Sequence, residues 1–342
     1  MKKLQNVLYI LTPDSYLFCQ NETIAIKIGG IEKVRIPSHT IESIVCFGNT
    51  TVSTPFIQFC GQRGIGLTFL SEYGRFYGRV NGPASGNVLL RKKQYELLSE
   101  DKYPLQLVSN ILLAKLLNSK NLLMRAAREH SQIESADELR EASSRITNIA
   151  KKISEADNID SLRGLEGVAA NEYFGVFDHM IKANKEDFKF TKRTKHPPED
   201  NINSLISFLY TLLKNDVQSA LEAVGIDPAA GFLHTLRPGR PSMALDLMEE
   251  LRASVCDRLA ISLINLKEIK GDDFSVEPSG IKLSDKARKV VINAWQKRKQ
   301  EEITHPFLEE KIPIGLIPFA QAQLLARNFR GDLDQYPPFI WK

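Results

Sequence analysis

The sequence predicts an α+β protein in which a small β-rich domain is followed by a larger all-helical one. Two observations lead to this fold class. Through the first eighty or so residues, short segments rich in β-branched and aromatic residues alternate with turn residues. From about residue 90, long stretches of Leu, Ala, Glu, Lys and Arg show helical periodicity. We therefore expect a β domain at 1–82 and a helical domain at 91–342.

The β domain is expected to hold short strands and a single helix. The helix is predicted in STPFIQFCGQRG, with Thr54 as its N-cap, Pro55 at its first position and Gly64 after its end. In GRFYGRV, successive side chains alternate between two faces, as they do in a strand. The expected strands are LYILT, TIAIKI, KVRIP, SIVCFG, GIGLTFL and GRFYGRV.

The seam between the domains is NGPASGN at 81–87, which consists of turn residues without periodicity. We place a linker at 83–90, and the helical pattern begins beyond it with NILLAKLLNSKNLLMRAAREH and its neighbours. After the helices at about 90–150, further helices are expected at about 161–183, 203–224, 242–267, 284–302 and 316–328.

Composition limits the function classes. With 342 residues, 43% hydrophobic and 25% charged, the chain can bury a core without covalent staples. A net charge of +4 fits a nucleic-acid binder but does not require one. No apolar stretch approaches the roughly 20 residues of a membrane helix, and no signal peptide is evident, so we expect a cytoplasmic protein without membrane contact. The cysteines are widely scattered, which predicts reduced thiols; they are Cys19, Cys46, Cys60 and Cys256.

Several catalytic motifs are missing from the sequence. It contains no phosphate-binding G-x-x-x-x-G-K-[ST] loop, no G-x-G-x-x-G that opens a helix after a strand, no G-x-S-x-G and no H-E-x-x-H. A nucleotide-hydrolysing motor, a dinucleotide oxidoreductase and a serine hydrolase are therefore poorly supported.

A carboxylate stands out in the predicted helix that begins at Ser161. Glu166 has Ala170, Tyr173 and Phe177 as its neighbours on one helical face, so that face is mostly apolar. A carboxylate in such surroundings must be paired, protonated or bound to a cation. Pairing with a nearby arginine such as Arg163 and participation in a functional site both remain open.

A second group of acids lies in GFLHTLRPGRPSMALDLMEELR, at 231–252. On a continuous helix capped by Ser242, these acids fall opposite the apolar stripe, which favours a solvated face. Clustered carboxylates nevertheless repel each other unless a cation offsets them, and Arg252 and Arg258 are candidates. His234 precedes the helix by a loop long enough to fold back over its start. The acids are Asp246, Glu249, Glu250 and Asp257.

Glu166, His234 and Glu249, with Asp246 beside them, form a set that a divalent metal active on phosphates would require. Carboxylate oxygens suit Mg²⁺ and Mn²⁺, and one imidazole favours Mn²⁺. Two or three protein ligands leave coordination positions open for water and a phosphate oxygen. The basic segment KANKEDFKFTKRTKHPP at 182–198 fits either a contact region for a phosphate backbone or a solvated loop.

The sequence resembles the CRISPR adaptation integrases, the first Cas protein, and is most similar to the type I-C versions. The resemblance covers essentially the whole chain. It rests most specifically on LRGLEGVAANEYF, HPPEDNINSLISFLYTLL and GFLH…ALDLMEELR, which occur in the family's order. The start MKKLQNVLYILTPDSYL and the ending LLARNFRGDLDQYPPFIWK also look like that subtype.

The resemblance implies a β-sandwich-like N-terminal domain that dimerises and a helical, metal-dependent catalytic domain. It implies a homodimer, and two such dimers that flank a dimer of the small second Cas protein in a heterohexamer-like complex. Its ligand positions match Glu166, His234 and Glu249, where some members have Asp in place of Glu249, and its supporting acid matches Asp246. The residues it would assign to DNA handling are Arg193, Lys195, His196 and Asn203.

The activity implied is phosphoryl transfer on double-stranded DNA with Mg²⁺ or Mn²⁺. The 3′-hydroxyl of a protospacer attacks a phosphodiester of the repeat array, and the same site cuts DNA when water is the nucleophile. Two other classes stay open: a non-catalytic DNA-binding scaffold and a Mn²⁺ phosphoesterase for small substrates. The likeness to type I-C versions makes a nuclease of the fourth Cas type a candidate partner.

Overall fold

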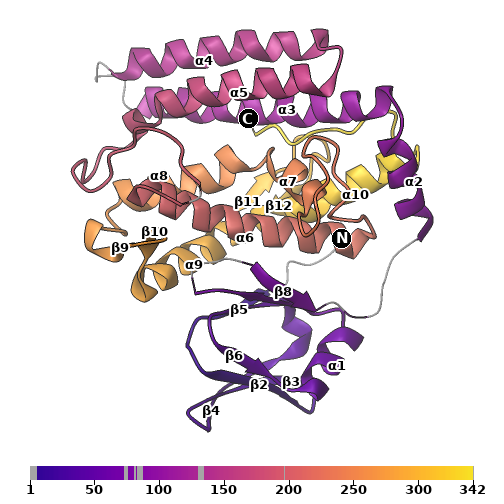
Figure 1. Ribbon diagram of the computed structural model, residues 1–342, viewed down its shortest axis with the longest axis vertical. Coiled ribbons are helices and arrows are strands. Elements are labelled where there is room, and N and C mark those ends of the chain that lie inside the picture. Colours follow the sequence, from indigo (N-terminus) through magenta and orange to yellow (C-terminus); the bar gives the residue numbers. More distant parts are fainter. Residues whose placement is uncertain are drawn as a thin grey trace. The chain divides into compact units, whose positions relative to one another are not determined.

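The computed structural model describes residues 6–72, 76–80, 82, 88–129, 135–195 and 197–341. The chain divides into two compact units, Met1–Ser85 and Gly86–Lys342 (Figure 1). The division falls within the expected linker at 83–90, most of which lies outside the described residues, so the linker itself remains a prediction.

The first unit contains two four-stranded sheets among its described residues. In one sheet β1, β5 and β7 are parallel and β8 is antiparallel; the strands are β1 (Asn6–Ile10), β5 (Ile41–Phe47), β7 (Gly66–Leu70) and β8 (Phe76–Val80). In the other, β4, β3 and β2 are antiparallel and β6 joins in parallel; the strands are β4 (Ile31–Pro37), β3 (Thr23–Ile28), β2 (Ser15–Gln20) and β6 (Thr50–Val52).

Both sheets share one apolar core with helix α1 (Thr54–Gln62). Leu17, Ile44 and Phe56, from the two sheets and the helix, are fully buried in it. The expected β-rich domain is therefore confirmed. The helix begins one residue earlier than expected, because the side chain of Ser53 accepts a hydrogen bond from the Phe56 N–H and acts as the N-cap.

The second unit is mostly helical. Helices α3, α4 and α5 pack together as one layer, and α6 packs against α7 and α10 (Figure 1). The helices are α2 (Val88–Leu98), α3 (Lys102–Glu129), α4 (Ser135–Lys152), α5 (Ile159–Gly175), α6 (Asn201–Val224), α7 (Ser242–Met248), α8 (Arg258–Asn265), α9 (Asp285–Gln300) and α10 (Ile317–Phe329). None of the helices within the described ranges is long and apolar enough to cross a bilayer.

Local sequence signals start the two helices nearest the site. Asn158 caps α5 by accepting a hydrogen bond from the Ser161 N–H at 2.8 Å. Asp200 caps α6 by accepting one from the Asn203 N–H at 2.7 Å, and Gly225 ends α6 in a left-handed conformation with φ 88°. These caps fix where Glu166 and Asn203 lie along their helices.

The second domain is helical as expected, and two short hairpins interrupt its helices. They are β9 (Phe274–Glu277) with β10 (Gly280–Leu283), and β11 (Glu302–Thr304) with β12 (Lys311–Pro313). The helix expected at 242–267 is also discontinuous: α7 ends at Met248, and a π-helical segment, η4 (Arg252–Asp257), precedes α8. A π-helical turn rotates the side chains that follow it relative to a regular helix.

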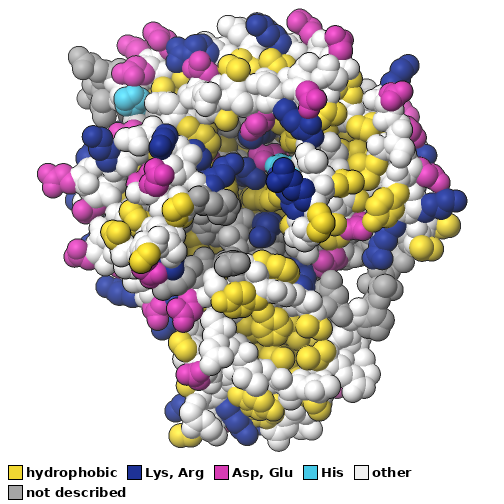
Figure 2. All heavy atoms as spheres, in the orientation of Figure 1, with side chains coloured by type: hydrophobic (Ala, Val, Ile, Leu, Met, Phe, Trp, Pro, Cys, Tyr) yellow, Lys and Arg dark blue, Asp and Glu magenta, His cyan; other side chains and the backbone are white. Residues whose placement is uncertain are grey.

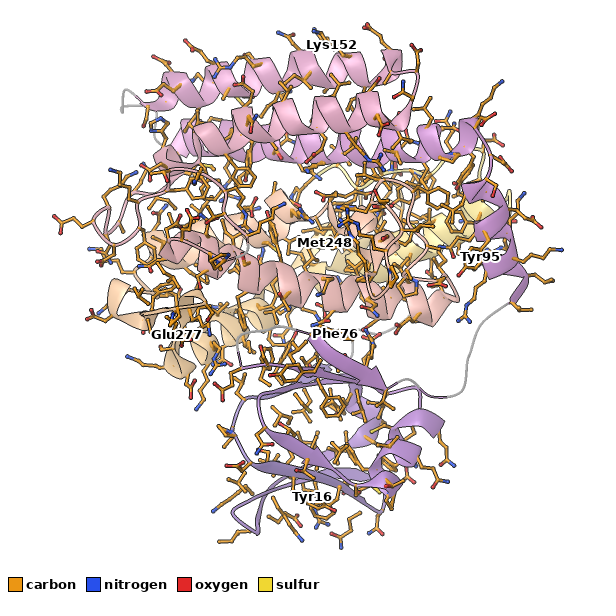
Figure 3. The ribbon with its side chains drawn as sticks, viewed as in Figure 1. Tyr16, Phe76, Tyr95, Lys152, Met248 and Glu277 are labelled. Carbon is orange, nitrogen blue, oxygen red and sulfur yellow. The ribbon has the colours of Figure 1, made fainter. Side chains whose placement is uncertain are left out.

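The C-terminal segment lies along α3 and also contacts Glu250, which follows α7. The side chains of Asn110, Asn118 and Asn121 donate hydrogen bonds to the backbone carbonyls of Tyr336, Phe339 and Trp341, respectively. The Phe339 N–H donates to the buried carboxyl of Glu250 at 2.9 Å, and burial raises the pKa of Glu250 to about 8. Figure 3 shows Met248, at the end of α7, in the interior of this unit, and it is 1% exposed.

Candidate active site

Asp246 on α7 holds the loop that carries His234. Its carboxylate accepts hydrogen bonds from the backbone N–H groups of Phe232, Leu233 and His234 at 2.6, 2.9 and 2.9 Å. Asp246 is fully buried, so these bonds compensate for the loss of water around its charge. The loop closes against α7 at Gly231, where an added Cβ would lie 2.5 Å from the Ser242 carbonyl carbon.

The same carboxylate orients the imidazole of His234. Nδ1 of His234 lies 2.6 Å from Oδ1 of Asp246, and Nε2 lies 3.9 Å from Oε1 of Glu249. A carboxylate that binds one ring nitrogen leaves the other available as a ligand. The loop thus folds back over the start of α7 and directs Nε2 of His234 toward Glu249.

Glu249 is 4% exposed and lies between two cations. Nζ of Lys115, from α3, is 2.9 Å from its Oε2, and Nη2 of Arg252 is 3.0 Å from its Oε1. Burial alone would favour the neutral acid. The charges of Arg252 and Lys115 outweigh burial and lower the pKa of Glu249 to about 2.

Glu166 on α5 pairs with the same lysine, and not with Arg163. Its Oε1 accepts a hydrogen bond from Nζ of Lys115. Arg163 instead donates to the Leu233 carbonyl and pairs with Asp160. One ammonium group therefore joins Glu166 and Glu249, two carboxylates that are 83 positions apart in the sequence.

The three expected ligands, Glu166, His234 and Glu249, lie near one another, but their side chains are not arranged to coordinate a metal ion as they stand. Within the described ranges, no three His, Cys, Asp or Glu side chains are placed so that they could hold an ion as they stand. The donor set nevertheless suits a divalent cation, because two carboxylates already surround one positive charge and Nε2 of His234 lies 3.9 Å from Oε1 of Glu249, one of the two. Lys115 lies where those carboxylates converge.

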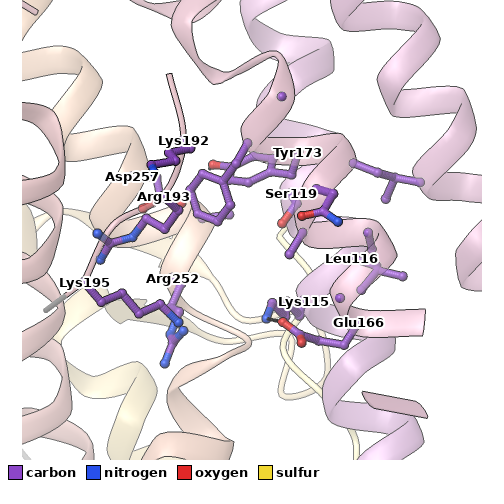
Figure 4. Close-up of a pocket in the computed structure, with 18 of the residues that line it drawn as sticks. Lys115, Leu116, Ser119, Glu166, Tyr173, Lys192, Arg193, Lys195, Arg252 and Asp257 are labelled. Carbon is purple, nitrogen blue, oxygen red and sulfur yellow. Dashed lines mark hydrogen bonds and ion pairs between the residues drawn. The ribbon is translucent and has the colours of Figure 1, made fainter. Parts of the chain in front are cut away.

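A cavity of about 490 Å³ opens beside Glu166 and Lys115. Arg193, Lys195 and Arg252 line it on the side opposite Lys115 and Glu166 (Figure 4). In Figure 2, Lys and Arg side chains gather near the middle of the helical unit on the face in view. The centre with the three expected ligands thus adjoins a basic cavity.

Asn203 orders the basic segment that precedes α6. Its Oδ1 accepts hydrogen bonds from Nη1 of Arg193 at 2.7 Å and from the Thr194 N–H at 3.0 Å, and its Nδ2 donates to the Lys192 carbonyl at 2.8 Å. Arg193 and Lys195 line the cavity, and Asn203 acts through Arg193. His196, the fourth residue expected to handle DNA, lies outside the described residues.

The family model of the CRISPR-associated protein Cas1 matches residues 8–297. The chain belongs to the Cas1 family. It is 47% identical to a CRISPR-associated endonuclease Cas1 of Rhodospirillum rubrum and 45% identical to one of Chlorobaculum tepidum. Each alignment covers 100% of this chain and 100% of the relative. These matches show that this Cas1 family member is a CRISPR-associated nuclease of the adaptation machinery.

Other Cas1 relatives are longer. A Cas4 exonuclease/Cas1 endonuclease fusion of Geobacter sulfurreducens is 32% identical over 97% of this chain and 60% of its own length. Among solved structures, a Cas1 protein of Thermotoga maritima is 24% identical and has a TM-score of 0.82 over 96% of this chain and 97% of that one. A Cas6–RT–Cas1–Cas2 complex is 23% identical, with a TM-score of 0.84 over 100% of this chain and 36% of that one.

The solvated acidic face favoured by a continuous helix is wrong for this Cas1 chain. Asp246, Glu249, Glu250 and Asp257 are all at most 4% exposed. The chain turns between α7 and η4, so a rotation of 100° per residue does not apply across it. Of the two arginines expected to offset the acids, Arg252 does so, whereas the guanidinium of Arg258 lies 5.3 Å from the Trp341 ring.

Sequence reasoning missed Lys115, and it missed the hydrogen bonds that the hydroxyls of Tyr173 and Tyr210 donate to the buried carboxylate of Asp257. Lys115 sits in an ordinary leucine-rich helical pattern, so nothing local distinguishes it. Phe188 and Phe190, which lie among the lysines of 182–198, are buried. The sequence pointed to Tyr173 as a residue near the site in one way only: it lies two helical turns after Glu166, on the same helical face.

Proposed function

We propose that this Cas1 chain joins and cuts DNA by phosphoryl transfer at a divalent metal held by Glu166, His234 and Glu249. The observation that supports this most directly is the convergence of the three side chains. Glu166 and Glu249 contact one ammonium group, and Nε2 of His234 faces Glu249. Carboxylate oxygens with one imidazole favour Mg²⁺ or Mn²⁺ over soft metals.

The chain's own residues divide the work around this centre. Asp246 fixes the ring of His234 through Nδ1 and so presents Nε2 as a ligand. The charges of Arg252 and Lys115 hold the pKa of Glu249 at about 2, so this carboxylate is ionised at neutral pH. A bound metal would stabilise charge on the phosphate and lower the pKa of a nucleophilic oxygen. Lys115, once displaced from the carboxylates, supplies a positive charge beside the transferred phosphate.

The proposed substrates are double-stranded DNA with 3′-hydroxyl ends and the CRISPR repeat array. The protospacer 3′-hydroxyl attacks a phosphodiester of the repeat, and Arg193, Lys195, His196 and Asn203 are the proposed DNA-handling residues. Asn203 supports this by holding Arg193 toward the cavity. We also propose that the chain belongs to the type I-C subtype.

The proposed assembly is a homodimer that works with the small second Cas protein. A fold match within a Cas1–Cas2 complex supports this partner. A Cas4 nuclease is a further proposed partner, because a relative carries Cas4 and Cas1 in one chain. The proposed division of labour is dimerisation by 1–82 and catalysis by 91–342.

The test uses the full chain with its small partner, a duplex with 3′-hydroxyl ends, and supercoiled DNA that carries a repeat. We expect joining that requires Mg²⁺ or Mn²⁺ and disappears in His234→Ala. His179→Ala is the matched control, because His179 lies on the surface against Glu138 and should keep full joining. Joining that persists in His234→Ala would overturn the assigned centre. DNA binding without any joining by the wild type would favour a non-catalytic scaffold.

A further inference from the structure

The turn that carries Glu249 lies between α7 and η4 and is tightly closed. The Glu249 N–H donates to the Asp246 carbonyl at 3.2 Å, and the Leu251 N–H donates to the Met248 carbonyl at 3.0 Å. Both bonds span three residues, where an α-helix spans four, so the backbone leaves the α-helical path at the proposed metal ligand. A buried carbonyl in such a turn needs a donor from another part of the chain.

Asn118 on α3 supplies that donor. Its Nδ2 donates a hydrogen bond to the carbonyl of Glu250 at 2.7 Å, and Glu250 is fully buried. Nδ2 of Asn118 also donates to the Phe339 carbonyl, and Oδ1 accepts from the Trp341 N–H, each at 2.8 Å. The side chain of Asn118 is 2% exposed and both of its polar atoms are satisfied, so it is held in one orientation.

The side chain of Glu250 anchors the same turn a second time. Its Oε2 accepts hydrogen bonds from the Phe339 N–H at 2.9 Å and from Nε2 of Gln321, on α10, at 3.0 Å. The side chain of Glu249 contacts Lys115 instead. The two consecutive acids therefore differ in their tasks, because Glu250 binds the turn to the interior and Glu249 reaches the proposed metal centre.

Helix α3 carries both Asn118 and Lys115, about one helical turn apart. Lys115 contacts the carboxylates of Glu166 and Glu249, and Asn118 holds the main chain one residue after Glu249. One helix thus sets both the position of the cation in the centre and the point from which the Glu249 side chain extends. Side chains that form a site are placed most accurately when regular elements and buried hydrogen bonds support them.

We propose that Asn118 is a positioning residue for the proposed metal centre. This inference rests on the proposed function. Asn118 fixes the turn of Glu249 and Glu250 against the C-terminal segment, residues 336–341, and so sets where the Glu249 carboxylate meets a divalent cation. It acts through the main chain of Glu250 and not by contact with the metal. Replacement of a group that supports a metal ligand typically weakens metal binding 10- to 100-fold.

The test compares Asn118→Ala with Asn121→Ala in the full chain. Asn121 is the matched control, because it lies on the same helix and donates to the Trp341 carbonyl at 2.6 Å, so it holds the C-terminal segment and not the turn. Titration calorimetry measures Mn²⁺ affinity at a temperature where melting curves show every protein folded. Asn118→Ala should bind Mn²⁺ about 10-fold more weakly, whereas Asn121→Ala should keep the wild-type affinity.

Joining of DNA gives a second readout, with the small partner present. At low Mn²⁺, Asn118→Ala should show a lower kcat with an unchanged KM for the repeat DNA, because the change concerns the metal ligand and not the DNA. An increase of about 10-fold in Mn²⁺ should restore most of the rate. A purely structural role of Asn118 would not produce this recovery at constant KM.

Asn118→Ser keeps a hydroxyl donor on a shorter side chain and should fall between the wild type and Asn118→Ala in Mn²⁺ affinity. If Asn118→Ala does not fold, Asn118→Ser carries the comparison with Asn121→Ser. Equal Mn²⁺ affinities of the Asn118 and Asn121 variants would overturn the inference, whether both are weakened or both match the wild type.

Failure of this inference differs from failure of the proposed function. Joining that depends on His234, together with full Mn²⁺ affinity in Asn118→Ala, would refute the role of Asn118 alone. If Mn²⁺ affinity depends on Asn118 but the wild type joins no DNA, the positioning role stands and the proposed activity fails.

Discussion

Lys115 is the residue whose replacement tests the charge balance of the centre most directly. Its ammonium contacts Glu166 and Glu249, the two carboxylates proposed as metal ligands. Lys115→Met removes the charge and keeps most of the side-chain volume. Without metal, the two carboxylates should then repel each other, and the folded state should lose stability.

The structure sets the size of this loss. Removal of one partner from a buried ion pair costs about 3–5 kcal/mol. The side chains of Lys115 and Glu249 are 16% and 4% exposed, but that of Glu166 is 30% exposed and Arg252 remains beside Glu249. Solvent and the arginine therefore offset part of the loss, and we expect about 3 kcal/mol in EDTA.

Divalent metal should reverse the effect. In the wild type a cation must displace Lys115 before it can bind both carboxylates. The Lys115→Met protein should therefore bind Mn²⁺ about 10-fold more tightly, which corresponds to a gain of about 1.4 kcal/mol in metal-dependent stabilisation. Urea unfolding with EDTA and with Mn²⁺ measures both quantities, and titration calorimetry measures the affinity directly.

Lys120→Met, on the same helix, is the matched control and should change neither quantity appreciably. The reasoning is refuted if the two variants lose equal stability in EDTA. It is refuted equally if Mn²⁺ stabilises Lys115→Met no more than it stabilises the wild type.

Three further predictions concern the supports of the centre. Asp246→Asn should lose about 3 kcal/mol in urea unfolding and weaken Mn²⁺ binding 10- to 100-fold, because an amide cannot accept all the bonds that hold His234. Gly231→Ala should lower stability by about 1–3 kcal/mol, because its Cβ would overlap the backbone of Ser242. Asp257→Asn should remove a pH dependence of the unfolding free energy. Burial raises the pKa of Asp257 from 3.8 to about 6, so the wild type loses up to about 3 kcal/mol as pH rises through that interval.

Each of these has an outcome that would contradict it. Unchanged Mn²⁺ affinity in Asp246→Asn would mean that the orientation of the imidazole does not depend on that carboxylate. A Gly231→Ala protein as stable as the wild type would show that the loop can move away from α7. Equal slopes of stability against pH in Asp257→Asn and the wild type would show that the buried carboxyl does not titrate there.

Local patterns predicted the elements better than the contacts between them. Turn residues, β-branched runs and helical periodicity predicted the β-rich unit, the start of α5 and the positions of α6 and α10, because those signals act over a few residues; α5 ends at Gly175, well before the expected 183. The helix expected at 242–267 failed, since its apolar stripe continues in sequence through the break between α7 and η4. That break is set by packing, which periodicity does not record.

For the candidate site, the sequence alone determined which acids and which histidine were available, together with the loop length that returns His234 to Asp246. Only the tertiary structure decided that the acids are buried, that Lys115 from α3 lies between Glu166 and Glu249, and that the guanidinium groups of Arg193 and Arg252 both lie over the ring of Tyr210. The reason is physical. The charge of a carboxylate in this interior depends on partners supplied by other helices, and those partners are neighbours only after the helices have packed.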